Sequence, residues 1–288
     1  MGEPRRIQQP GPEAPDRIES AVGRLQVLDF TLEPGLTLNS AITAPLVAAG
    51  FRAAQVELSG GALGPFTYVM PAAATDDQHA AWYSAAFTPA GETRFERGCA
   101  TFGRKDGAPF IHCHSFWTEA DGRRNGGHIM PHETVVAAPI QARAYGAAEV
   151  ETTADFDPET NFTIFHPHAL QTPQGAGPRI AFARARPNID LFQAVEEICR
   201  RHGFTAGRLR GGVGSIIGAR FADGTRVDDY ATEVFITSGT ITPDVTGKLI
   251  ADISLALVGL TGTMAQSQLT RGDNPVLITF ELAVEEAA

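Results

Sequence analysis

Four of the eight histidines lie in the segment FIHCHSFWTEADGRRNGGHIMPHE, and the spacing of the first three is compatible with a shared chemical role. His112 and His114 are two residues apart. On a β-strand their imidazoles would lie on one face, about 6.5–7 Å apart at the backbone, because alternate residues of a strand point the same way. Neutral imidazole is a ligand for zinc, copper, iron and nickel. The pair therefore predicts part of a metal site.

The third histidine, His128, reaches this pair if the chain turns back between them. The intervening segment ADGRRNGG contains Asp-Gly and Gly-Gly, which are typical of turns. A hairpin centred on Asp121 would place His128 opposite His114, with about 4.5–5.5 Å between their Cβ atoms. We therefore predict that His112, His114 and His128 hold one divalent metal ion, with zinc as the first choice because it is commonly available. Gly126 and Gly127 would let the backbone approach this site closely.

The neighbouring side chains leave the rest of this site open. Three protein ligands leave a fourth position for water, a substrate or a group from a neighbouring subunit. His132 is an alternative ligand, although we prefer to place it in an exposed turn. Cys113 alternates with the two strand histidines, so we expect it in the core on the opposite face. We interpret His166 and His168 as residues of a linker between two halves of the chain.

The elements that must position these histidines occur in the same order in both halves of the 288-residue chain, which is long enough for two domains. Each half has a helix, a Gly-Phe pair, a strand and a glycine-rich bend. The second helix would run from an Asn188 cap to Gly203, whereas Pro45 predicts a kink or a late start in the first. Residues 134–144 and 276–284 alternate or are β-branched, which indicates antiparallel sheet. We predict an α/β (α+β) fold of two related domains.

Composition shifts suggest where these domains begin and end. Residues 1–20 lack apolar periodicity and read as a flexible leader. The turn-rich stretch 151–178 favours a boundary that gives one domain at 21–155 with the histidines and another at 156–288 without them. In the second domain Asp252 and Gln266 occupy the places of the histidines and would make a poor transition-metal site. We interpret that domain as structural or interface-forming.

The overall composition narrows the class of protein. The net charge is −10, which disfavours nucleic acid as a partner because such binding depends on Lys and Arg. Cys99, Cys113 and Cys199 form no CxxC motif, which favours a reducing compartment. No apolar run is long enough to span a membrane. We expect a cytoplasmic protein with no membrane contact.

Two motifs resemble one known family. The segment HCHSFWTEADGRRNGGHIMP resembles the HxH…DGxxxGGHL signature of the plant and prokaryote conserved (PPC) domain, and IDLFQAVEEICRRHGFTAGRLRGGVGSIIGARFADG is similar to that family's helix and GGIGS turn. Two copies would cover most of the chain, although the first has GGALG at the turn and the second lacks the histidines. The resemblance implies a mostly antiparallel sheet, a trimer, and in prokaryotic members a metal held at His112, His114 and His128. Three two-domain chains would then form two stacked rings.

Three functions are compatible with these features. The first is a metal-binding oligomer with a ligand-binding or regulatory role. The second is a metal-dependent hydrolase or lyase that uses a metal-bound water, with Glu119, His132 or Glu133 as candidates for proton transfer. Whether the chain is an enzyme stays open.

The third function is a DNA-binding regulator, because plant members of the family carry AT-hooks. The nearest approach to a hook is Arg184-Ala185-Arg186-Pro187, which has Ala where a hook needs Gly. We interpret it as the lead-in to a helix. The arginines between positions 179 and 210 leave a local basic face as an alternative to a solvated face or subunit contact. GGVGS lacks the lysine of a phosphate loop, so we expect no nucleotide.

Overall fold

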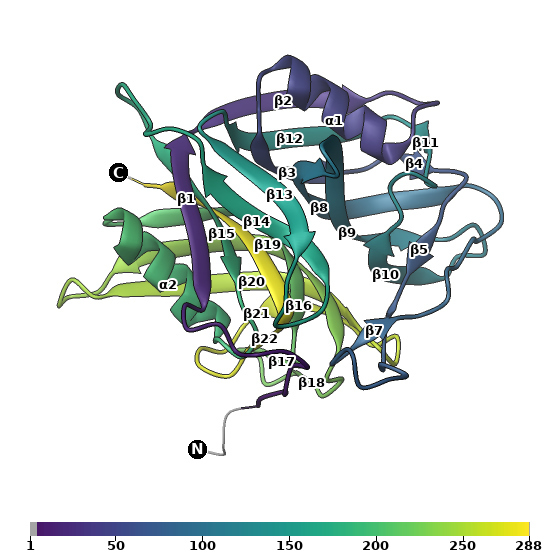
Figure 1. The fold of residues 1–288 in the computed structure, drawn as a ribbon. Helices are drawn as coiled ribbons and strands as arrows, with labels where there is room; N and C mark the ends of the chain where they lie inside the picture. Colours follow the sequence, from purple (N-terminus) through teal and green to yellow (C-terminus); the bar gives the residue numbers. More distant parts are fainter. Residues whose placement is uncertain (1–4, 288) are drawn as a thin grey trace.

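The computed structural model describes residues 5–287, and this part of the chain is largely β (Figure 1). It contains two helices, α1 (Leu38–Ala48) and α2 (Leu191–His202). The expected mostly antiparallel sheets, each with one packed helix, are found, but the small helix content makes the described residues largely β rather than α/β. Neither helix is long and apolar enough to cross a membrane.

The first sheet has eleven strands and carries the histidines. Its main path is β2 (Gln26–Leu32), β12 (Ile140–Ala147), β3 (Ala53–Ser59), β8 (Thr93–Lys105), β9 (Ala108–Thr118), β10 (Arg124–Ile129) and β5 (Tyr68–Val69). Four strands branch from this path: β4 (Ala62–Leu63), β11 (Val136–Ala138), β13 (Val150–Phe156) and β14 (Thr163–Ala169). All pairings are antiparallel except that of β13 with β8.

The second sheet has seven strands, all antiparallel to their neighbours. Their order is β1 (Ile18–Arg24), β15 (Arg179–Ala185), β22 (Val276–Glu286), β16 (Gly207–Ile216), β19 (Thr232–Pro243), β20 (Leu249–Gly259) and β21 (Met264–Gln268). Two short ribbons complete the fold: β6 (Pro71–Ala72) with β7 (Trp82–Tyr83), and β17 (Ala219–Arg220) with β18 (Arg226–Val227).

The two sheets repeat one topology. In the first, the order β2-β12-β3-β8-β9-β10 begins with the strand that precedes α1, and β3 follows that helix. In the second, the order β15-β22-β16-β19-β20-β21 begins with β15, the strand that precedes α2, and β16 follows that helix. The repeated order of features in the sequence therefore corresponds to a repeated strand order in space.

The sheets divide the chain differently from the expected boundaries. β1 begins inside the expected leader and pairs with β15, so it covers an edge of the second sheet that would otherwise present unpaired backbone groups. Residues ahead of it are also held, since Arg5 pairs with Asp273 and Gln9 donates to the backbone oxygen of Leu277. Residues 1–4 lie outside the described residues. The boundary expected after residue 155 falls within β13, and the chain passes to the second sheet only after β14.

The helix ends follow the local sequence signals in part. Asp190, not Asn188, caps α2, because its carboxylate accepts from the backbone amides of Phe192 and Gln193. Asn188 has φ 65° and bonds to the backbone of Ile7 instead. Gly203 ends the helix in the left-handed conformation, as predicted. The other helix begins at Leu38 and continues through Pro45.

The sheets pack face to face, with each helix on an outer face. Side chains from both sheets form the core between them: Cys99, Phe116, Val213, Phe235 and Ala256. Gly211, expected in a bend, instead lies within β16 at φ 118°, and a Cβ there would be 2.8 Å from the Sγ atom of Cys99. The glycine-rich segment therefore lets β16 approach the first sheet. The inner face of β9 lies against the second sheet.

Candidate metal centre

The β9–β10 hairpin brings the three histidines together. His128 pairs with His114 in the register that was predicted, and the strand pairing is centred on Asp121. The two glycines before His128 are required by close contacts. A Cβ on Gly126 would lie 2.6 Å from the Phe116 ring, and one on Gly127 would lie 2.6 Å from the backbone oxygen of Val69.

The ring nitrogens of these histidines converge. Nε2 of His114 lies 2.9 Å from Nε2 of His112 and 3.3 Å from Nδ1 of His128. All three candidate ligand atoms lie within 4.8 Å of one another. The spacing of residues in the sequence therefore predicted a real cluster of nitrogens.

Groups from the second sheet fix which nitrogens carry protons. Nδ1 of His114 donates to the backbone oxygen of Val234 at 2.9 Å, and Nδ1 of His112 donates to the carboxylate of Glu281 at 3.0 Å. Since a carbonyl and an ionised carboxylate can only accept, each ring carries a proton on Nδ1, and the neutral form of each ring has its lone pair on Nε2. These lone pairs face the centre of the cluster. Such partners commonly orient metal-binding histidines.

A second carboxylate from the same sheet reaches the centre itself. Oε2 of Glu233 lies 2.7 Å from Nε2 of His114. Sequence reasoning missed Glu233 and Glu281, because neither lies at a position of the second half that corresponds to the histidines. The available signal was a carboxylate within each of two apolar strand segments, TEVFIT and ITFELAV. Charged residues are rarely buried without a partner.

The environment affects the basicity of the rings differently. Burial lowers the pKa of His128 well below its usual value, and the charges of His112 and His114 lower it further. Burial also acts to lower the pKa of His112, but the charge and hydrogen bond of Glu281, with the charge of Glu233, raise it overall. His128 is therefore neutral at pH 7 and offers its lone pair.

Other predicted residues lie outside the cluster. His132 is exposed, and its ring stacks on Phe110 with 5.7 Å between centroids. Glu119 is buried at the hairpin end, where it accepts from Tyr68 and Arg123. Cys113 packs in the core on the α1 side of the sheet, as expected from strand alternation.

Two further histidines, and the two residues of the second half that were expected to correspond to the clustered histidines, have other contacts. His166 and His168 lie in β14 rather than in a linker, and Nδ1 of His166 is 2.7 Å from Glu19. Asp252 accepts a hydrogen bond from Gln268 at the exposed face of the second sheet, not from Gln266. The second domain, as far as the structure describes it, thus lacks a cluster at the equivalent place, but it contributes to the one in the first.

The arginines between positions 179 and 210 are largely committed to carboxylates. Arg184 is fully buried against Asp157 and Glu19, and Arg186 contacts the same acids. Ion pairs form at Arg179, Arg184, Arg186, Arg200, Arg201 and Arg210. The local basic face, which the sequence left open as an alternative, is therefore mostly neutralised.

A chamber of about 400 Å³ opens beside the histidines. His112, His128 and Glu281 form one wall. The rest of the lining is mainly apolar and aromatic, including Phe110, Phe162 and Phe165. It also includes three exposed polar residues: Lys105, His132 and Glu133. A mostly apolar cavity with a few polar groups is typical of small-molecule sites.

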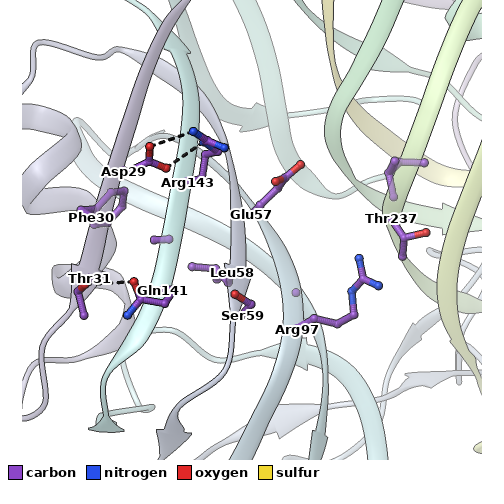
Figure 2. Close-up of a pocket in the computed structure, with 13 residues that line it drawn as sticks. Asp29, Phe30, Thr31, Glu57, Leu58, Ser59, Arg97, Gln141, Arg143 and Thr237 are labelled. Carbon is purple, nitrogen blue, oxygen red and sulfur yellow. Dashed lines mark hydrogen bonds and ion pairs between the residues drawn. The ribbon is translucent and has the colours of Figure 1, made fainter.

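A larger groove of about 820 Å³ lies elsewhere, on strands β2, β12, β3 and β8. Figure 2 shows two interactions among its polar side chains: Arg143 pairs with Asp29 at 2.9 Å, and Thr31 bonds to Gln141 at 3.4 Å. None of the three clustered histidines lines it. The chamber therefore has the stronger claim to a ligand.

Comparison with known proteins gives fold neighbours only. No known family model matches the chain, and no curated protein does. Among solved structures, a plant- and prokaryote-conserved (PPC) protein of Pyrococcus horikoshii is 16% identical, with a TM-score of 0.40, and the match covers 53% of this chain and 96% of that one. This chain is similar to that PPC protein over about half of its own length.

Two further solved structures match a similar share. A protein of Archaeoglobus fulgidus described as metal-containing is 20% identical, with a TM-score of 0.39, over 51% of this chain and 96% of its own. A Salmonella protein is 18% identical, with a TM-score of 0.37, and the match covers 52% of this chain and 97% of the Salmonella chain. Each of the three matches covers about half of this chain, and one of the three is a PPC protein, the family that the two motifs resemble.

Proposed function

We propose that this protein binds one divalent metal ion, zinc in the first instance, through His112, His114 and His128, and that the centre binds a small-molecule ligand in a regulatory or carrier role. The observation that carries the proposal is the convergence of three imidazole nitrogens, two of them with lone pairs oriented by the second sheet. Neutral imidazoles fit zinc, and such a centre would supply Lewis acidity beside the chamber.

The chamber indicates where the ligand would lie. It adjoins His112 and His128, and its walls include the rings of Phe110, Phe162 and Phe165. A ligand with an apolar body and one metal-binding group would bury the body there and direct the group towards the histidines. Lys105, an exposed residue of the lining, favours an anionic substituent.

Metal analysis tests the proposal. The purified protein, expressed with added zinc, should contain close to one metal ion per chain, and His114→Ala should contain almost none, because ligand loss removes most of the affinity. His132→Ala is the matched control, since His132 lies outside the cluster, and it should retain the metal. A metal-free wild-type protein would rule the site out.

A metal-dependent hydrolase or lyase is the second candidate, favoured by Glu133 and His132 at the chamber. A bound metal would lower the pKa of a water molecule towards neutrality. Glu119 is no longer a candidate for proton transfer, because it is bonded to Tyr68 and Arg123. Metal-dependent turnover of model esters that falls in Glu133→Gln would support this function. Absence of turnover by the metal-loaded protein would leave the binding role alone.

We further propose that the chain forms a trimer in the cytoplasm, with nucleic acid not among its partners. The proposal follows from the sequence resemblance and the acidic net charge. Light scattering should give about 92 kDa, three times the chain mass of 30.6 kDa. A dimer would contradict the trimer, and retention on heparin at low salt would contradict the second part.

A further inference from the structure

Among the described residues, two buried carboxylates at the histidine cluster have histidines but no lysine or arginine as ion-pair partners. Glu233 is 9% exposed and Glu281 is 3% exposed. Within residues 5–287 their ion-pair contacts are to His114 and His112 only, with no lysine or arginine in range. Burying unpaired negative charge is costly, because the low-dielectric interior replaces water poorly. The site therefore requires positive charge, either from a bound cation or from additional protons on these histidines.

Nearby arginines do not supply it. Arg184 lies across from Glu281 in the strand register, but its guanidinium contacts Asp157, Glu19 and Thr279. It belongs to a group in which three arginines meet three carboxylates: Arg17, Arg184, Arg186, Glu19, Asp157 and Glu159. This group is balanced within itself. A divalent cation at the histidines would balance Glu233 and Glu281.

The position of Glu233 adds a geometric argument. The proton of His114 is on Nδ1, so the lone pair of Nε2 faces both Oε2 of Glu233, at 2.7 Å, and Nε2 of His112, at 2.9 Å. Lone pairs at these distances repel one another unless a cation or an additional proton lies among them. Three imidazole nitrogens consequently surround one point, and the Oε2 atom of Glu233 lies beside one of them.

We propose, building on the metal site proposed above, that Glu233 of the second sheet is the fourth and anionic ligand, and that Glu281 is a positioning residue that holds His112. The metal ion would then connect the two sheets. The second domain would contribute a ligand to the metal centre, in addition to any structural role. A ligand in the chamber would add as a fifth group, as zinc sites permit, or displace the carboxylate.

Metal affinity and spectroscopy of the full chain test this inference. Zinc affinity is measured by competition with a chromophoric chelator, and the ligand set by the absorption of the Co²⁺-substituted protein. Glu233→Gln should weaken zinc binding by more than about 100-fold and change the Co²⁺ spectrum, since it alters a ligand. Glu281→Gln should weaken binding by about 10- to 100-fold but leave the Co²⁺ spectrum unchanged. Glu285→Gln, four residues along β22 and paired with Arg210, is the control and should match wild type.

Stability of the metal-free protein separates this inference from a simple salt bridge. If Glu233 is a ligand, removing its charge should leave the metal-free chain as stable as wild type or more stable. If His114 is instead a protonated partner of Glu233, the same variant should be less stable. That result, or a Glu233→Gln protein with wild-type zinc affinity and Co²⁺ spectrum, would overturn the inference. A wild-type protein that binds no metal would instead refute the proposed function.

Discussion

At the scale of single residues, the glycines before His128 decide how closely β10 approaches its neighbours. Gly127 has φ 156°, and a Cβ there would press on the backbone of Val69, which cannot move as a flexible side chain can. We predict that Gly127→Ala lowers the free energy of unfolding by about 1–3 kcal/mol. It should also weaken zinc binding at least tenfold, because His128 is the next residue.

A second glycine provides the control for this prediction. Gly122 at the hairpin turn also has positive φ, 86°, but a Cβ there would meet no atom within 4 Å. Gly122→Ala should cost about 1–2 kcal/mol through backbone strain alone and leave zinc affinity unchanged. Denaturant unfolding and chelator competition measure both quantities. Equal zinc affinities in the two variants would show that close approach at Gly127 does not position His128.

The residues of the site differ in how far they could be predicted. His112, His114 and His128 follow from strand alternation and one turn, which are local and depend on nearby residues only. Glu233 and Glu281 are far away in the chain, and they reach the cluster only because one sheet packs on the other. No periodicity within either segment encodes that packing. A carboxylate in an apolar strand indicates a buried partner but does not identify it.

At the scale of elements, a charged group attaches β1 to β14 and β15. Glu19 of β1 contacts His166 of β14, Arg184 of β15 and Arg186, which directly follows β15. Burial acts to raise the pKa of Glu19, but the hydrogen bond from His166 and the charges of the arginines outweigh it and lower the pKa from 4.5 to about 2. The ionised carboxylate is therefore favoured by folding.

The sign of this shift gives a pH-dependent prediction. Because the folded-state pKa of Glu19 is depressed, its contribution to stability is complete above about pH 4.5 and is lost as the pH falls towards 2. We predict that Glu19→Gln lowers the free energy of unfolding by about 1–3 kcal/mol at pH 7. The difference from wild type should shrink below pH 4.5.

Denaturant unfolding across this pH range provides the measurement for Glu19→Gln. Glu13→Gln is the comparison, since Glu13 makes only exposed ion pairs with Arg6 and Arg17 and should change stability by less than about 1 kcal/mol. A loss in Glu19→Gln that stays constant from pH 7 to pH 3 would mean that the charge of Glu19 does not stabilise the fold.

Element boundaries show the same limit of sequence reasoning. The two helices and the hairpins were predictable from caps, periodicity and turn residues. The strand within the expected leader has no such local signal, because β1 is stabilised by pairing with β15, more than 150 residues later. Asn188 and Asp190 are both good capping residues for α2, and only the chain path from Ile7 decides between them.

At the scale of the whole molecule, the histidine cluster lies where the two sheets meet. A metal ion that binds the folded chain and not the unfolded one must stabilise it by mass action. Free zinc at about 100 times its dissociation constant adds about 2.7 kcal/mol. For a chain of this size we predict that chelation lowers the melting temperature by roughly 5–10 °C, with His114→Ala insensitive to the chelator.

The strands that metal removal destabilises distinguish a metal site held by one domain from a metal site shared by two. If Glu233 and Val234 of β19 and Glu281 of β22 help to hold the centre, metal removal should speed amide hydrogen exchange in β19 and β22 as well as in β9 and β10. The outer strand β2, far along the first sheet, is the internal reference and should not change. Faster exchange confined to the β9–β10 hairpin would mean that the first domain holds the metal alone and that the two sheets are joined by packing only.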